Sequence, residues 1–367
     1  MPVTMLNKRR VPSSPPPAQD GGKEIDFPKG PQDTVSALRW SPVDHHLAAS
    51  SWDGSVYIYD ARNATKTDDI KPVTAIHIGC PVLDCDFGKD GTLAAAAAAD
   101  NKVHLLDMAS GQRIELASHS KPVRSVRFIE APFASSPLVA SGSWDKTIRC
   151  WDPRQPRPVA TIELPERVWA MDASAKFLAA ATANNELQLI DLGRRGAFRV
   201  SRAIEPPWEH QITSLSLARD GSRWAAGCIG GRAAVQACDD RTTSFAHLSF
   251  KCHREPDPIH NNNNSSSKNG ARVNVYAVND VAFCPAGSNL LATAGSDGTY
   301  SLWNVSARCR VRAYPKAEGP ITAASFRSDG KAIACAVGYD WAQGYLGNRP
   351  GAVCKVMLRM LEDGLTT

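Results

Sequence analysis

A short unit that repeats along the chain constrains the fold more than any other feature of the sequence. Its clearest copy is SGSWDKTIRCWD, which runs from Ser141 to Asp152. Alternating residues on both sides of the polar turn Trp144-Asp145-Lys146 predict two strands joined by a hairpin. Related copies begin at Thr34, Pro81, Pro122, Val168, Ile212, Val278 and Ile321.

The spacing of these copies predicts their architecture. Their closing residues Asp60, Asp107, Asp152, Asp191 and Asp239 are 47, 45, 39 and 48 residues apart, and Asn304 follows after 65. A period of about 40–45 residues with four strands per repeat is typical of WD-type propellers. The longest interval contains HNNNNSSSKNG, a polar low-complexity stretch over residues 260–270. We therefore predict an all-β, seven-bladed WD40 β-propeller over residues 23–360, with a polar insertion loop over residues 255–273.

Closure of the ring requires an additional strand. A propeller must close its ring, because otherwise the last blade leaves an unpaired strand edge. KEIDF, from Lys23 to Phe27, is the candidate strand for this closure, and we expect it to pair near Val353 to Leu358.

The six alanines at residues 94–99 favour a helix by propensity. Their place in the repeat nevertheless predicts the second strand of the second blade.

The ends and the overall composition set broad limits. Residues 1–22 are rich in proline, serine and glycine and are predicted to be disordered, and residues 361–367 form a short C-terminal tail. Lys8-Arg9-Arg10 fits either a nuclear import signal or an ordinary solvated patch. A net charge of +5 permits an acidic partner or nucleic acid without requiring either. Because the sequence has no membrane-length apolar run and no signal-peptide core, we expect a soluble intracellular protein.

The residues that could carry chemistry favour a binding protein. The ten cysteines include no CxxC pair, so reduced thiols are expected, with no metal site and no cofactor. His119, Ser141 or Ser143, and Asp145 invite comparison with a catalytic triad. Together with the indole donor Trp151, which has no place in a triad, they are better interpreted as a structural hydrogen-bond set. No phosphate loop, HExxH pair or nucleophile elbow is present, so no enzyme activity is expected.

Large or charged residues in turns are the candidates for a binding surface. Trp52 and Trp144 both precede the aspartate of a turn. They could be exposed interface anchors, or each ring could fold over its own blade. In FKCHR, residues 250–254, Lys251, His253 and Arg254 follow a predicted strand. An arginine at such a rim can donate two parallel hydrogen bonds to a carboxylate or phosphate.

Several motifs resemble one known family. They are SGSWDKTIRCWD, IELPERV (162–168), FKCHR, VYAVNDVAF (275–283), AGSDGTYSLW (294–303) and YDWAQG (339–344). In this order they resemble the poly(A)+ RNA export factors, WD40 propellers of the nuclear pore, from about residue 26 to residue 358. The spindle-checkpoint WD40 proteins share SSWD, GSWD and FKCHR, but LPER and YDWxxG resemble the export branch more closely.

The resemblance implies a binding mode and a set of residues. It implies a propeller that binds a GLEBS segment, whose paired glutamates meet the arginine of FKCHR. Carried over to this chain, the peptide-binding residues are Trp52, Trp144, Lys251 and Arg254. Trp341 and Tyr339 match a rim that is expected to meet RNA or another partner. The export branch usually has a lysine at the position of Gln343, so this chain lacks one charge on that rim.

Three functions follow as alternatives. The first is an mRNA export adaptor in the nucleus and at the nuclear pore, shuttling to the cytoplasm. It would bind a GLFG-repeat nucleoporin through the GLEBS segment and contact mRNA or mRNA-bound export proteins. The second is a spindle-checkpoint protein that binds GLEBS segments of checkpoint kinases. The third is a ubiquitin-ligase substrate receptor, which rests on the fold alone.

Overall fold

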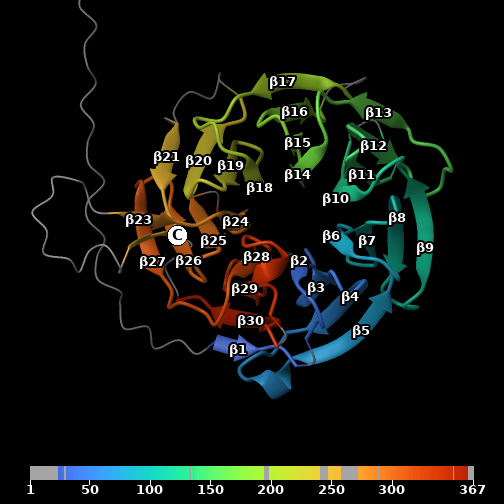
Figure 1. Cartoon of the computed structure of the whole chain (residues 1–367). Helices are drawn as coiled ribbons and strands as arrows, with labels where there is room; N and C mark the ends of the chain where they lie inside the picture. The colour runs from blue at the N-terminus through green and yellow to red at the C-terminus, as the bar shows by residue number, and fades with distance from the viewer. Residues whose placement is uncertain are drawn as a thin grey trace, which may run out of the picture.

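The strands form a closed ring of blades. The computed structural model describes residues 24–28, 30–131, 134, 136–193, 198–239, 247–257, 272–287, 289–349 and 351–362. In this part of the chain, seven four-stranded antiparallel sheets surround a central channel (Figure 1). The chain passes around the ring from blade to blade, and within blades 1–6 it runs from the channel outwards. The prediction of an all-β, seven-bladed propeller is confirmed.

The first four blades are built from consecutive strands. Blade 1 contains β2 (Val35–Trp40), β3 (His46–Ser51), β4 (Ser55–Asp60) and β5 (Lys71–His77). Blade 2 contains β6 (Val82–Phe87), β7 (Leu93–Ala98), β8 (Lys102–Asp107) and β9 (Arg113–Ser118). Blade 3 contains β10 (Val123–Ile129), β11 (Leu138–Ser143), β12 (Thr147–Trp151) and β13 (Ala160–Glu163). Blade 4 contains β14 (Val168–Ala173), β15 (Phe177–Thr182), β16 (Leu187–Asp191) and β17 (Val200–Ile204).

The remaining blades follow the same plan until the ring closes. Blade 5 contains β18 (Ile212–Leu217), β19 (Arg223–Cys228), β20 (Arg232–Ala237) and β21 (Leu248–Lys251). Blade 6 contains β24 (Val278–Phe283), β25 (Leu290–Gly295), β26 (Tyr300–Asn304) and β27 (Cys309–Ala313). Blade 7 contains β28 (Ile321–Phe326), β29 (Ala332–Val337), β30 (Lys355–Met360) and β1 (Glu24–Asp26). Two 3₁₀-helical turns, η1 (Thr67–Asp69) and η2 (Tyr345–Gly347), lie in loops.

The two ends of the propeller hold each other, as predicted. β1 pairs with β30 in antiparallel register, with Ile25 opposite Leu358. The backbone N–H of Phe27 extends the pairing to the carbonyl oxygen of Val356 at 2.8 Å. Ile25 and Phe27 are both buried in the cluster between blades 7 and 1. Lys23, the tail over residues 1–22 and most of residues 361–367 lie outside the described residues.

The alanine run forms the predicted strand, and the packing on its two faces explains why. Ala94, Ala96 and Ala98 of β7 pack in a cluster with Ile58 of blade 1. The intervening Ala95 and Ala97 pack with residues of blade 3, including Trp151. A second strand covered on both faces by neighbouring blades leaves little room for larger side chains. Tertiary packing here outweighs the helix propensity of alanine.

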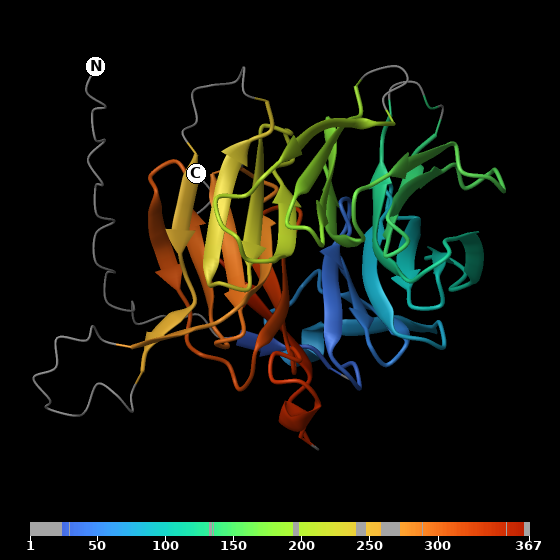
Figure 2. The same ribbon diagram turned by 45° about the horizontal axis from the view of Figure 1, so that its top comes forward.

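The described part of the insertion after blade 5 contains two short strands. β22 (Arg254–Pro256) and β23 (Val273–Val275) pair as a two-stranded antiparallel ribbon. The predicted loop over residues 255–273 therefore begins and ends in strand, while residues 258–271 lie outside the described residues. The ribbon and the loop that carries η2 project from the same face of the propeller (Figure 2). No helix in the described part of the chain is long and apolar enough to cross a membrane.

Candidate functional site

The blade topology places most of the candidate residues on one face. In each blade the second and fourth strands end on the same side of the ring, because all neighbouring strands are antiparallel. Trp52 follows β3, Trp144 follows β11, Trp341 follows β29, and Arg254 comes shortly after β21. We call this side the hairpin face, since it carries the turns between second and third strands.

Arg254 is held in place on this face by two backbone carbonyl groups. Its Nη2 donates to the carbonyl oxygen of Gly230 at 2.8 Å, and its Nε donates to that of Gly231 at 3.3 Å. The side chain is half-buried. A guanidinium group has five N–H donors, so others remain for a ligand. Within the described residues Arg254 forms no ion pair with a carboxylate.

The turn that fixes Arg254 requires its two glycines. A Cβ atom at Gly230 would lie 2.1 Å from Cδ2 of His210. Gly231 has a φ of +59°, and a Cβ there would lie 2.9 Å from Cγ1 of Val275. Side chains at either position would force neighbouring atoms apart and would also strain the backbone at Gly231. The local sequence Gly230-Gly231 therefore allows the carbonyl groups to approach the guanidinium group.

The predicted tryptophans differ in how far they are exposed. Trp52 is 41% exposed and Trp341 is 45% exposed. Trp144 is half-buried, and its indole N–H is buried without a hydrogen-bond partner among the described residues. Tyr339 lies beside Trp341, with ring centroids 5.6 Å apart. Lys251 is exposed at the end of β21. Trp52 thus offers an open apolar surface, whereas Trp144 lies between the two predicted alternatives.

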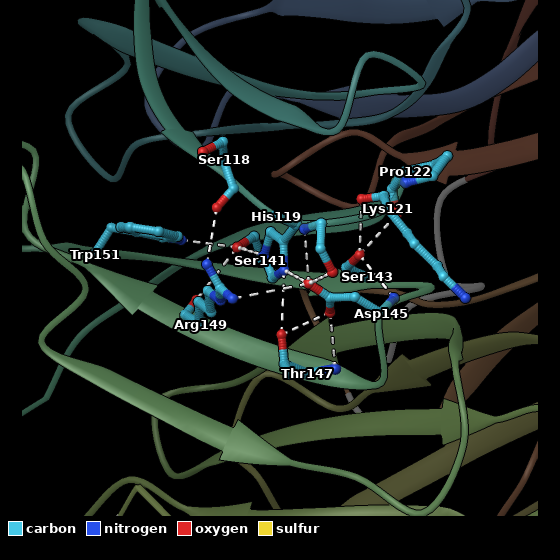
Figure 3. A network of polar contacts seen from close by, with 11 residues as sticks. Ser118, His119, Lys121, Pro122, Ser141, Ser143, Asp145, Thr147, Arg149 and Trp151 are labelled. Atoms are coloured by element: carbon cyan, nitrogen blue, oxygen red, sulfur yellow. Dashed lines mark hydrogen bonds and ion pairs between the residues drawn. The ribbon is translucent and has the colours of Figure 1, made fainter.

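The residues of the proposed structural set meet in blade 3 (Figure 3). His119 contacts the carboxylate of Asp145 through Nδ1 at 2.9 Å and the hydroxyl of Ser141 through Nε2 at 2.7 Å. Trp151 donates its indole N–H to the same hydroxyl at 2.8 Å. Ser143 makes separate bonds, donating to the carbonyl oxygens of Lys121 and Pro122.

The protonation states in this set follow from burial. Burial lowers the pKa of His119, although the carboxylate of Asp145 opposes the change. Burial alone would raise the pKa of Asp145, but hydrogen bonds from Thr147 and the contact with His119 outweigh it and lower the pKa to about 2. A neutral imidazole beside an ionised carboxylate must carry its proton on Nδ1. Its Nε2 then accepts a hydrogen bond from the hydroxyl of Ser141. The oxygen of this buried hydroxyl in turn accepts a hydrogen bond from the indole N–H of Trp151. This arrangement suits a structural role.

A second set of the same kind lies in blade 6. His253 contacts Asp297 through Nδ1 at 2.9 Å and Thr293 through Nε2 at 3.0 Å. Trp303 donates to the Thr293 hydroxyl at 3.0 Å. His253 is buried and does not join Lys251 and Arg254 as a surface cation. Sequence reasoning missed this set, although an alignment of the blades would have placed His253 opposite His119.

The described residues include no group of three or more histidine, cysteine, aspartate or glutamate side chains placed to hold a metal ion. All ten cysteines are free thiols, and most are buried. Burial raises the pKa of the Cys85 and Cys150 thiols to about 12. Such thiols act as small apolar core residues.

Known proteins match this chain over most of its length. The model of the WD domain, G-beta repeat, matches residues 22–60, 111–152 and 272–304. A poly(A)+ RNA export protein of Schizosaccharomyces pombe is 37% identical over 336 residues, covering 92% of this chain and 90% of that protein. The mRNA export factor GLE2 of Chaetomium thermophilum is 36% identical over 339 residues, covering 91% and 89%.

A third relative has a name that records the repeat rather than a function. The WD40 repeat protein poxJ of Penicillium oxalicum is 36% identical over 342 residues, covering 93% of this chain and 94% of that protein. Each of these three relatives is at least 36% identical to this chain over more than nine-tenths of its length. The chain belongs to the family of WD40-repeat poly(A)+ RNA export factors.

Proposed function

We propose that the protein is a non-enzymatic mRNA export adaptor that docks at the nuclear pore. In this proposal its hairpin face binds the GLEBS segment of a GLFG-repeat nucleoporin, and it contacts mRNA or mRNA-bound proteins elsewhere. Relatives that match more than 90% of the chain are named as RNA export proteins, which supports the export role. The protein would accordingly be found in the nucleus and at the nuclear envelope, shuttling to the cytoplasm.

The observation that carries the binding proposal is the state of Arg254. Two carbonyl groups orient its guanidinium group, yet no carboxylate of the described residues neutralises it. A fixed, half-buried cation is well suited to a bidentate contact with one of the paired glutamates of a GLEBS segment. Its orientation is set before binding, so less side-chain entropy is lost when the peptide arrives. Exposed Trp52 supplies apolar surface on the same face.

Calorimetric titration with a GLEBS peptide tests this assignment. Arg254→Ala should weaken binding by roughly 2–5 kcal/mol, because a glutamate buried in the complex would lose its partner. Arg254→Lys should recover part of the loss, since an ammonium group restores the charge but not the fork. Trp52→Ala should cost about 2 kcal/mol if the ring is a central contact.

Arg62→Ala is the matched control, because Arg62 follows β4 and so lies on the opposite face. It should bind with wild-type affinity. Circular dichroism of each variant checks that the propeller is folded. Unchanged affinity in folded Arg254→Ala would move the peptide site elsewhere on the propeller. Absence of binding by the wild-type chain would contradict the docking proposal itself.

A further inference from the structure

The central channel contains a polar cavity that the proposed peptide site does not use. Its volume is about 90 Å³, and its charged lining residues are Arg39, Asp84, Arg124, Arg127 and Asp280. All five lie on inner strands: Arg39 on β2, Asp84 on β6, Arg124 and Arg127 on β10, and Asp280 on β24. Strands from four different blades therefore bring these groups to the central channel, which faces the viewer in Figure 1.

One of the three guanidinium groups is neutralised by the protein. Arg127 donates through Nη1 to the carboxylate of Asp84 at 2.6 Å and through Nε to that of Asp172 at 3.0 Å. The side chains of Arg127 and Asp84 are almost completely buried. Asp84 also accepts the backbone N–H of Cys85 at 2.9 Å. This cluster is complete without any ligand.

Asp280 does not neutralise the remaining charge directly. Its carboxylate accepts from the hydroxyl of Ser214 at 2.6 Å and from the backbone N–H groups of Val281 at 2.9 Å and Ala324 at 2.8 Å. None of these donors is an arginine. Burial raises the pKa of Asp280, while the hydrogen bonds from Ser214 and Ala324 and the positive charge of Arg39 oppose the rise.

Arg39 and Arg124 are left with few partners. Arg39 donates through Nη1 to the carbonyl oxygen of Leu38 at 3.3 Å, and Arg124 donates through Nη1 to that of Leu83 at 3.0 Å. Neither forms an ion pair within the described residues. Each guanidinium group therefore keeps most of its five donors available. Burial lowers the pKa of Arg124; the carboxylates of Asp84 and Asp280 oppose this change, whereas the guanidinium groups of Arg127 and Arg39 add to it.

We propose that the central channel binds one small oxyanion, such as phosphate or sulfate, between Arg39 and Arg124. Guanidinium groups bind such anions through paired hydrogen bonds. The anion would accept hydrogen bonds from the N–H donors that the protein leaves unused on both guanidinium groups. The cavity of about 90 Å³ is far below the roughly 300 Å³ at which pockets for drug-sized ligands begin. It suits a free anion rather than a nucleotide.

Thermal unfolding of the full chain in inorganic phosphate, against sodium chloride of equal ionic strength, tests the proposal. The melting temperature should rise by about 3 °C or more and should saturate, as expected for one site that only the folded state offers. Arg39→Gln and Arg124→Gln should each need at least tenfold more phosphate for half of the effect. The melting temperature of each variant in chloride alone is the baseline from which its response to phosphate is measured.

Three controls separate a specific site from general salt stabilisation. Arg62→Gln removes an exposed guanidinium group and should keep the wild-type response. Arg39→Lys keeps the positive charge but lacks the paired N–H donors of a guanidinium group, so it should respond at an intermediate phosphate concentration. This variant also tests the proposal if a Gln variant fails to fold. Equilibrium dialysis with radiolabelled phosphate should give one phosphate per chain. An unsaturated rise that is equal in all variants would be general exclusion of the salt from the protein surface and would overturn the proposal.

Discussion

The buried His119 makes the stability of blade 3 depend on pH. Burial depresses the pKa of His119 in the folded state, so the folded protein resists a proton that the unfolded chain accepts below about 6.5. The unfolded state then binds more protons, and the free energy of unfolding should fall as the pH drops below that value. The contribution of His119 is fully present above the unfolded pKa and is lost as the pH falls towards the folded pKa.

Urea denaturation at about pH 7.5 and about pH 5.5 measures this loss, and His119→Gln should reduce it. The comparison with the variant is needed because burial raises the pKa of Asp86 to about 6, which contributes with the opposite sign. A raised carboxyl pKa favours the folded state as the pH falls. Exposed His77→Gln controls for the loss of any histidine. Identical pH dependence in wild type and His119→Gln would contradict the assigned role.

The sequence predicted which side chains meet in blade 3, but it did not predict which side chains near Arg254 are buried. His119, Ser141, Asp145 and Trp151 could be grouped from sequence, because they fall at fixed positions of one repeat. His253 was instead grouped with Lys251 and Arg254, because the sequence alone does not show which of these neighbouring basic residues is buried. The structure turns His253 inwards to Asp297 and leaves Arg254 at the face. The carbonyl groups that orient Arg254 come from another loop, so no local pattern could have revealed them.

At the level of elements, β1 is a short strand with a large expected effect. Deleting residues 1–22 should leave the melting temperature nearly unchanged, because β1 begins at Glu24. Deleting residues 1–30 also removes Ile25 and Phe27, which are 5% and 6% exposed. Loss of two buried side chains at roughly 1.5–3 kcal/mol each should lower the free energy of unfolding by about 3–6 kcal/mol. It would also leave β30 as an unpaired edge.

Two point variants separate the loss of packing from truncation itself. Ile25→Ala and Phe27→Ala in the full chain should each reproduce part of the effect of deleting residues 1–30. Thermal scans followed by circular dichroism provide the measurement. Equal melting curves for the two truncations would mean that pairing between β1 and β30 contributes little to closing the ring.

Strand positions were predictable because the repeat supplies seven aligned copies of one pattern. The Ala94–Ala98 segment shows how strong this constraint is, since the composition of this one copy alone favours a helix. The ribbon of β22 and β23 was not predicted, because it occurs once and has no equivalent in the other blades. Its strands are only three residues long and flank a polar segment. Nothing in such a stretch distinguishes a paired ribbon from a loop.

Across the whole molecule, side chains of the inner strands link every blade to the next. Asp86 accepts the backbone N–H of Phe128 in blade 3 at 2.8 Å, and Asp172 accepts that of Leu217 in blade 5 at 2.7 Å. The other junctions use Ser36 to Val82, Arg127 to Asp172, Val281 to Ser214, Ala324 to Asp280, and Trp40 to Ser325. These links are invisible in any one repeat, since each joins residues about 40 or more positions apart.

Arg127 joins three blades at once and allows the sharpest test of this linkage. It lies on β10 of blade 3 and pairs with Asp84 of blade 2 at 2.6 Å and Asp172 of blade 4 at 3.0 Å. Arg127→Ala would leave two carboxylates without their cation, and the loss should be about 3–5 kcal/mol in the free energy of unfolding. Arg154→Ala is the matched control, because Arg154 pairs with Asp152 at 2.7 Å while its side chain is 61% exposed.

Arg154→Ala should destabilise the protein much less than Arg127→Ala, because the guanidinium group of Arg154 lies largely in water, which screens its charge and competes for its hydrogen bonds. Urea denaturation of both variants, followed by tryptophan fluorescence and by circular dichroism, gives the two free energies. If both variants lose the same small amount, the inner-strand charges do not hold the blades together. If Arg127→Ala alone is strongly destabilised and its two signals still change together, the ring unfolds as one unit. Its stability then depends on contacts between the inner strands of neighbouring blades.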